Sequence, residues 1–264
     1  MNDPTVAVVG AGVTGLACAT ALAGRAQAAV VDRIPVAGGV LGWDHPRVPA
    51  LVDAAQAAGA RLCLGETAIR WDGHTLIAIG PDGVRRIEAQ ALVVAAGTRP
   101  QGRAELGLAG PRPAGILPAT VACHLTETGL LIGRRPAVIG SGDWAVRAVH
   151  HLLPAGIEQI TVLTPGETLC ELPRDPRVCV RERARVTGVA GAHRVSAVEL
   201  EDGEQVECDA VVLAHGLVPL RNVDGAVWDG PQTVYAQPLD DPGDIDAAAA
   251  AGAEAAAAVL ELLA

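Results

Sequence analysis

The sequence predicts an α/β protein in which one strand, turn, helix and strand arrangement is built twice. The first copy begins with the β-branched run Thr5–Val9, which a glycine-rich turn joins to the Ala- and Leu-rich stretch 15–23. The second begins with the apolar run Pro136–Ile139, followed by another glycine-rich turn and a helical pattern over 146–153. Each copy closes with a further buried strand and a glycine, so we expect two domains of the Rossmann type.

The remaining elements follow from run length, alternation and turn residues. In the first copy they are a strand at 28–31, a helix at 50–58, a strand at 61–64, a β-meander at 66–88 and a buried strand at 91–95. In the second copy they are a strand at 160–164, a hairpin at 195–207 and a strand at 210–214, and a short strand at 233–236 and an Ala-rich helix at 246–263 end the chain. Three prolines between Thr164 and Val178 exclude the usual crossover helix there.

The stretch 100–118 is rich in proline and glycine, which predicts a crossing between domains. We therefore expect one domain from residues 1–109 and 227–264, and an inserted domain from residues 110–226.

Composition excludes several classes of function. The net charge of −10 argues against nucleic-acid binding, which needs basic surface. No apolar run approaches the roughly 20 residues of a membrane span, and the first strand starts too early to leave room for a signal peptide. We therefore expect a cytoplasmic protein that does not associate with membranes. The six cysteines form no CxxC pair and no zinc-site spacing, so neither a disulfide framework nor a metal is expected.

The first glycine-rich turn has the spacing of a dinucleotide-binding turn, Gly10-x-Gly12-x-x-Gly15, between a strand and a helix. In such a turn Gly10 permits the tight bend, Gly12 lets a pyrophosphate approach the backbone, and Gly15 lets helix and strand pack closely. Asp32 ends the second strand, where a carboxylate can hold a ribose hydroxyl. These features predict a bound nucleotide; the alternative is a glycine turn with a purely structural role.

The second turn, residues 140–145, has Ala at the third glycine position. The strand after it ends in Thr164-Pro165, without an acid for a ribose and without an arginine cluster for a 2′-phosphate. The sequence therefore leaves open whether this site takes NADH or NADPH, and whether the domain is kept for packing alone.

Several motifs resemble the pyridine nucleotide–disulfide oxidoreductase superfamily. They are the strand and tripeptide 93–98, the stretch 208–219 with its strand-Gly-x-x-Pro element, and the two glycine turns. Residues 112–143 are most similar to FAD/NAD(P)-binding subunits of hydrogen cyanide synthase and of hydroxyproline and opine dehydrogenases. The resemblance implies an FAD-dependent oxidoreductase that uses FAD and NAD(P)H. The residues expected to contact the cofactors are Gly10, Gly12, Val13, Thr14, Gly15, Asp32, Arg33, Gly39, Val40, Ala68, Ala96, Gly97, Thr98 and Asp244 at the first site, and Gly140, Gly142, Asp143, Trp144 and Gly216 at the second.

Three departures from the superfamily pattern bear on activity. Gln237-Pro238 stands where relatives carry a Gly-Asp that grips the flavin, so either Asp244 substitutes or flavin binding is weakened or lost. The chain is shortened on the side that covers the flavin. The redox CxxC is missing, and only Cys123-His124 lies in the corresponding stretch.

Three functional hypotheses remain open. The first is a flavoprotein subunit of a hetero-oligomeric dehydrogenase or oxidase acting on a small amine or amino acid. The second is a non-catalytic partner that scaffolds a catalytic subunit. For the assembly, a homo-oligomer is the alternative to a complex with another subunit. The third is a thiol oxidase that uses Cys123. Cys123 and His215 are the weak catalytic candidates, and the substrate and the partner are not identified.

Overall fold

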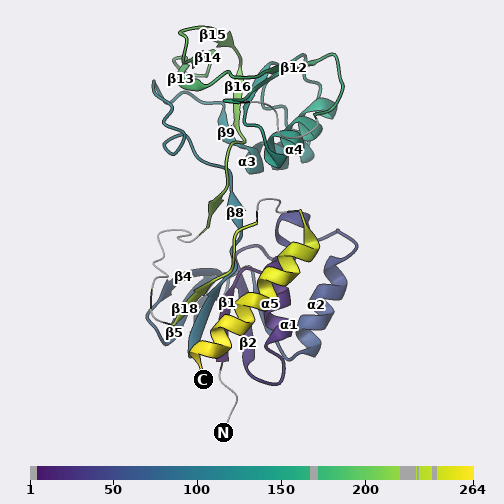
Figure 1. Ribbon diagram of the computed structural model, residues 1–264, viewed down its shortest axis with the longest axis vertical. Helices are drawn as coiled ribbons and strands as arrows, with labels where there is room; N and C mark the ends of the chain where they lie inside the picture. Colours follow the sequence, from purple (N-terminus) through teal and green to yellow (C-terminus); the bar gives the residue numbers. More distant parts are fainter. Residues whose placement is uncertain (1–4, 167–171, 221–229, 231, 240–242) are drawn as a thin grey trace. The chain divides into compact units, whose positions relative to one another are not determined.

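The computed structural model describes residues 5–166, 172–220, 230, 232–239 and 243–264. The chain forms two compact units, Met1–Thr98 with Pro219–Ala264, and Arg99–Val218 (Figure 1). The domain limits expected from the sequence at 109/110 and 226/227 stay predictions, and the second of them lies outside the described residues.

A five-stranded parallel sheet forms the centre of the first unit, in the order β18-β7-β1-β2-β3. Its strands are β1 (Thr5–Val9), β2 (Gln27–Asp32), β3 (Arg61–Leu64), β7 (Ala91–Val94) and β18 (Thr233–Tyr235). Val8 of β1 pairs with Val30 on one side and with Val93 on the other, and all three are completely buried. Continuous β-branched runs suit a parallel sheet that is covered on both faces.

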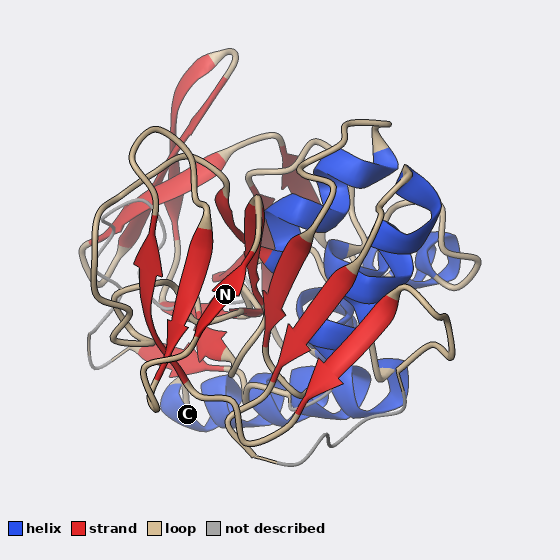
Figure 2. Cartoon of the chain, turned by 90° about the horizontal axis from the view of Figure 1, so that it is seen from above, coloured by secondary structure: helices blue, strands red, loops and turns tan. Residues whose placement is uncertain are grey.

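Two different layers cover this sheet. Helices α1 (Val13–Ala21), α2 (Val48–Ala57) and α5 (Ile245–Leu262) pack on one face, over a core that includes Val6, Leu16 and Val259. The antiparallel meander β4 (Thr67–Trp71), β5 (Thr75–Gly80) and β6 (Gly83–Glu88) packs on the other, over Trp71, Leu76 and Ile87. Figure 2 shows the long helix α5, which ends at the C-terminus. A short 3₁₀ turn, η1 (Gly39–Leu41), precedes α2.

Small side chains allow α5 to approach α1 closely. The buried positions of α5 are alanines apart from Gly252 and Val259. A Cβ at Gly252 would collide with the carbonyl oxygen of Thr14 in α1 and would lie 2.9 Å from the Cβ of Ala17. The low aromatic content of the chain therefore fits a helix layer whose backbones nearly touch.

The second unit repeats the parallel sheet, in the order β12-β11-β10-β16-β9. The elements are β9 (Ile116–Pro118), α3 (Ala119–Glu127), β10 (Pro136–Ile139), α4 (Asp143–Leu152), η2 (Leu153–Ala155), β11 (Ile160–Leu163), β12 (Val178–Arg181) and β16 (Ala210–Leu213). A three-stranded antiparallel sheet, β13 (Val186–Ala190), β14 (Ala197–Leu200) and β15 (Gln205–Glu207), packs over a core with Leu163, Val198 and Leu213. The two-residue strands β8 (Thr98–Arg99) and β17 (Val218–Pro219) pair with each other.

These sheets confirm the α/β fold and its repeated order. The path from β11 to the parallel strand β12 contains no helix within its described residues, 164–166 and 172–177. Helix α3 and strands β12 and β13 were not predicted. None of the helices built from described residues combines the length and the apolar character of a membrane span.

Candidate functional site

The glycine turn of the first unit lies at the carboxyl edge of the parallel sheet. Gly10 has a φ of 112°, and a Cβ there would collide with the carbonyl oxygen of Ala95, just after β7. A Cβ on Gly15 would collide with the carbonyl oxygen of Gly10, because α1 starts directly above the turn. Both glycines are therefore required by the packing of the protein itself.

Gly12 is different. Its φ of −74° suits any residue, and the nearest atom to a Cβ built there is the Cα of Gly39, at 3.7 Å. The fold alone would accept a side chain at this position. A glycine that the fold does not need is expected where a ligand must approach the backbone closely.

The start of α1 suits an anion. Gly12 is the N-cap and has no side chain to cap the helix, and the first turn, which includes Val13 and Thr14, contains no acidic residue. The N-terminal amides of a helix and its dipole favour phosphate at such a position. The structure therefore fits the pyrophosphate of a dinucleotide.

Asp32 lies beside the turn, at the end of β2. Its carboxylate accepts hydrogen bonds from the backbone N–H of Ala11 at 2.7 Å and of Ile34 at 2.9 Å. These bonds fix the carboxylate at the edge of the sheet and leave lone pairs for a ribose hydroxyl. Arg33 is exposed next to it.

A second glycine loop lies against the first. The N–H of Gly38 donates to the carbonyl of Ala11 at 2.9 Å, and Gly38 and Gly39 have φ angles of 122° and 59°. The loop brings η1, and with it Val40, beside Gly12. The segment 96–98 continues from β7 past Gly10, which places Ala96, Gly97 and Thr98 at the same edge.

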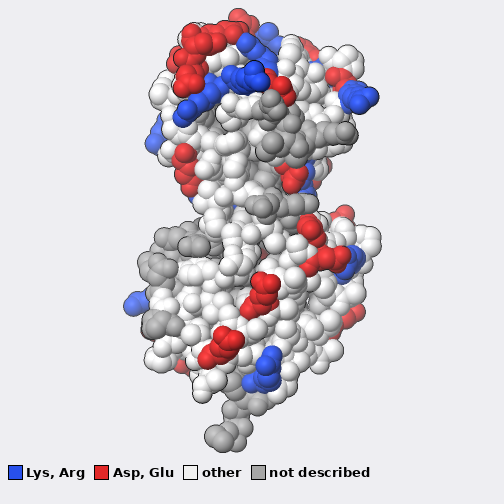
Figure 3. Space-filling model, viewed as in Figure 1, with Lys and Arg blue, Asp and Glu red and all other residues white. Residues whose placement is uncertain are grey.

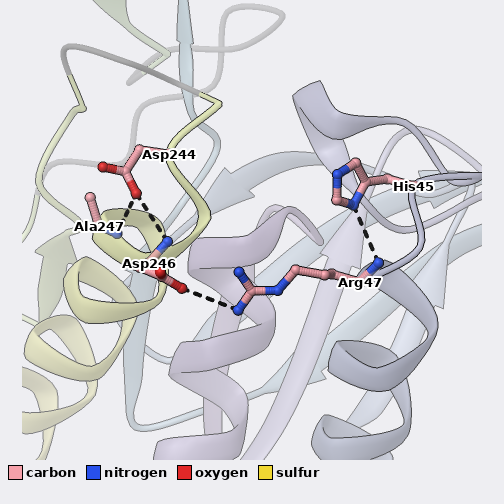
Figure 4. Close-up of polar contacts among 5 residues, drawn as sticks. All are labelled: His45, Arg47, Asp244, Asp246 and Ala247. Carbon is pink, nitrogen blue, oxygen red and sulfur yellow. Dashed lines mark hydrogen bonds and ion pairs between the residues drawn. The ribbon is translucent and has the colours of Figure 1, made fainter.

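Asp244 is the N-cap residue of α5 and caps that helix with its side chain. Its carboxylate accepts the N–H groups of Asp246 and Ala247 at 3.1 and 3.0 Å, as a helix cap (Figure 4). Gln237-Pro238 follows β18 without forming an element. That Asp244 also grips a flavin remains a prediction.

Figure 4 shows a contact that sequence reasoning missed. Arg47, the N-cap of α2, reaches Asp246 of α5 at 3.1 Å, and its N–H donates to Nδ1 of His45 at 3.3 Å. The two paired residues are 199 positions apart, so no local pattern could reveal them.

Ala68, in contrast, is buried in β4, in the core between the meander and the parallel sheet.

The second turn is built on the same plan. Gly140 has a φ of 152°, and a Cβ there would collide with the carbonyl oxygen of Ala214 and lie 2.9 Å from the backbone nitrogen of His215. A Cβ on Gly142 would meet no atom within 4 Å. This turn too has open space at its central glycine, but the first turn of α4 carries Asp143, which is less favourable to phosphate.

Other residues predicted for the second site gather around this turn. Trp144 is buried in the first turn of α4, and the guanidinium of Arg147 lies 5.2 Å from its ring centre. The carbonyl of His215 accepts the N–H of Gln101 at 3.0 Å, and Gly216 has a φ of 62°. The structure thus holds the first-site set in one unit and the second-site set in the other.

Cys123 does not have the environment of a reactive thiolate. It is buried in α3, and burial raises the pKa of its thiol to about 11. The neighbouring His124 is exposed and lies 4.0 Å from Glu127. Burial and a raised thiol pKa disfavour the thiolate, so this environment argues against activation by His124, and a thiol-oxidase role for Cys123 stays a prediction.

Comparisons with known proteins agree with this geometry. A family model described as pyridine nucleotide-disulphide oxidoreductase matches residues 5–227. A search of curated proteins finds no match.

Three solved structures illustrate the shared fold. Thioredoxin reductase of T. acidophilum is 19% identical with a TM-score of 0.66, and 99% of each chain is covered. L-proline dehydrogenase from P. horikoshii is 18% identical with a TM-score of 0.67, over 98% of this chain and 55% of that one. The water-forming NADH oxidase from Lactobacillus brevis, bound to NADH, is 15% identical with a TM-score of 0.67, over 97% and 69%.

At these identities the structural likeness shows the fold, whereas the family match covers most of the chain. FAD, with NAD(P)H as electron donor, is the cofactor pair of that family. The chain belongs to the pyridine nucleotide-disulphide oxidoreductase family.

Proposed function

We propose that the chain binds FAD at the Gly10–Gly15 turn and NAD(P)H at the second turn, and transfers electrons as one subunit of a hetero-oligomeric dehydrogenase or oxidase. The substrate class that we assign to the whole enzyme is a small amine or amino acid. The observation that carries the cofactor assignment is Gly12, which borders open space beside an uncapped helix N-terminus.

In this proposal the residues of the chain bind the cofactor and orient it. The amides at the start of α1 hold the pyrophosphate, and Asp32 holds a ribose hydroxyl at the end of β2. Bound FAD supplies the two-electron chemistry. The backbone carbonyls and amides of residues 96–98 lie beside the turn, at the same carboxyl edge of the parallel sheet.

The subunit assignment depends on the sequence and on one neighbour. Residues 112–143 resemble the FAD/NAD(P)-binding subunits of amino-acid dehydrogenases. The L-proline dehydrogenase matched above carries a name of the same substrate class, and this chain spans 55% of it. Both support a role as part of a larger enzyme.

A non-catalytic scaffold is the second candidate, because of the end of the fold. Gln237-Pro238 follows β18, and the nearest acid of α5 that could replace the missing Gly-Asp already accepts two backbone N–H groups. A chain that binds nucleotide but does not turn over would match this arrangement.

A visible spectrum of the purified chain, followed by anaerobic titration with NADH and NADPH, separates the candidates. The proposal predicts flavin bands, release of FAD on denaturation, and bleaching by one of the two nicotinamides. Bound FAD without bleaching, in the chain and in its native complex, would favour the scaffold. A protein that neither contains FAD nor binds it when FAD is added would refute the flavoprotein assignment.

A further inference from the structure

The ion pair between Arg47 and Asp246 joins the N-terminal ends of α2 and α5. Arg47 occupies the N-cap position of α2 and Asp246 lies in the first turn of α5, and both helices pack against α1. Each of α1, α2 and α5 follows a parallel strand of the same sheet, either directly or after a loop. All three helices therefore start at the carboxyl edge of that sheet. Figure 4 shows the Arg47 side chain extended from α2 toward α5, with α1 between the two helices in the view.

Arg47 can readily exchange Asp246 for another anionic partner. The two side chains are 56% and 85% exposed, and the contact is a single N–O approach of 3.1 Å. Exposed pairs of this kind contribute at most about 1 kcal/mol. A phosphate offers arginine a stronger, bidentate partner.

The charges around the turn explain why a cation is needed there. Asp32 and Asp44 lie on the segments that border the turn, and Asp244 and Asp246 begin α5. Figure 3 shows Asp and Glu side chains spread over the visible face of this unit, with few Lys or Arg among them. Without Arg47, the helix amides and Arg33 would have to hold a doubly charged pyrophosphate against these carboxylates.

We infer that Arg47 is a phosphate-binding residue of the first site, and that Asp246 holds it in place until the pyrophosphate of a dinucleotide takes over. The inference rests on the proposed binding of FAD at this turn. It assigns opposite roles to the two partners of one ion pair: Arg47 promotes binding, and Asp246 competes with the ligand.

The test compares the two partners in the full chain, with FAD affinity followed by flavin fluorescence. Arg47→Gln is expected to weaken FAD binding by at least about tenfold, since it removes a charge-assisted contact. Asp246→Asn is expected to leave the Kd unchanged or to lower it by up to about fivefold. Arg47→Lys, which keeps a point charge, should recover part of the loss. Arg86→Gln, at an exposed arginine of β6, is the control for net charge and should bind as the wild type does.

Competition by ADP identifies the part of the ligand that Arg47 contacts. ADP carries the pyrophosphate without the flavin, so its inhibition constant should rise by the same factor as the Kd of FAD in Arg47→Gln. The loss should shrink as salt concentration rises, because charge attraction is screened.

Three results would overturn the inference while leaving FAD binding intact. They are an Arg47→Gln Kd within twofold of wild type, an equal loss in Asp246→Asn, and an ADP constant that does not change. Failure of the wild-type chain to bind both FAD and ADP would instead overturn the proposed function together with this inference. Circular dichroism of each variant checks that it is folded.

Discussion

Replacing Gly252 with alanine tests whether α5 is held by close backbone packing on α1. Two effects of opposite sign compete. Alanine in a helix interior is favoured over glycine by about 1 kcal/mol. Against this, the added methyl group would collide with the carbonyl oxygen of Thr14 and lie 2.9 Å from the Cβ of Ala17 and from the backbone nitrogen of Cys18.

The geometry sets the size of the packing loss. Carbon atoms in ordinary contact are about 3.5–4.0 Å apart, so α5 must retreat by roughly 0.5–1 Å, which forfeits a quarter to a half of each contact energy along the interface. Overpacking of this kind costs about 1–3 kcal/mol. After subtraction of the helix-propensity gain of about 1 kcal/mol, we expect Gly252→Ala to lower the free energy of unfolding by up to about 2 kcal/mol.

Urea unfolding followed by tryptophan fluorescence measures this change. In a background with Trp144→Phe and Trp228→Phe, the remaining tryptophans, Trp43 and Trp71, both belong to the first unit. The control is Ala253→Gly at the exposed neighbouring position, which reports helix propensity alone and should cost about 1 kcal/mol. The packing argument would be refuted if Gly252→Ala were more stable than wild type by as much as Ala253→Gly is less stable.

Three further predictions concern a turn, an ion pair and the thiols. Gly10→Ala should destabilise the chain by at least about 2 kcal/mol in urea unfolding, because it forces a side chain into a positive-φ position against backbone. Arg99 and the Gly102 amide lower the pKa of the Glu105 carboxyl to about 2. Because that pKa is depressed, Glu105→Gln should be less stable than wild type at pH 7, by at most about 1 kcal/mol. This difference in unfolding free energy should disappear as the pH falls from about 4.5 to about 2. A difference that does not change with pH would count against the ion pair. With a thiol reagent at pH 7.5, Cys179→Ser should remove a fast-reacting group and Cys123→Ser should not, since Cys179 is exposed and Cys123 is buried. Loss of a fast-reacting group in Cys123→Ser but not in Cys179→Ser would support the hypothesis of a reactive Cys123.

Local patterns were enough to predict most of the fold. The strand at 61–64 and the meander turn before Gly83 follow from alternation and turn residues, and both lie where expected. Helix α3 was missed because its buried positions, including Ala119, Cys123 and Thr126, are small or polar and give a weak apolar period. Strand β12 was missed because its apolar run, Val178-Cys179-Val180, is only three residues long and too short to predict a strand.

The candidate site divides in the same way. The spacing of the glycines and Asp32 is local and was predicted from the sequence. An Asp before an Ala-rich helix is a recognised cap signal, and Asp244 could have been assigned as one. The pairing of Arg47 with Asp246, however, depends on the packing of three helices, which no spacing encodes.

The central claim is that the space beside Gly12 belongs to FAD, and Gly12→Ala tests it most directly. A methyl group there has 3.7 Å to its nearest neighbour in the protein, so the variant should fold, with an unfolding free energy within about 1 kcal/mol of wild type. The account predicts that this folded variant, mixed with FAD and passed through a desalting column, retains less than about a tenth of the FAD that wild type retains. Equal retention by the two proteins would contradict it.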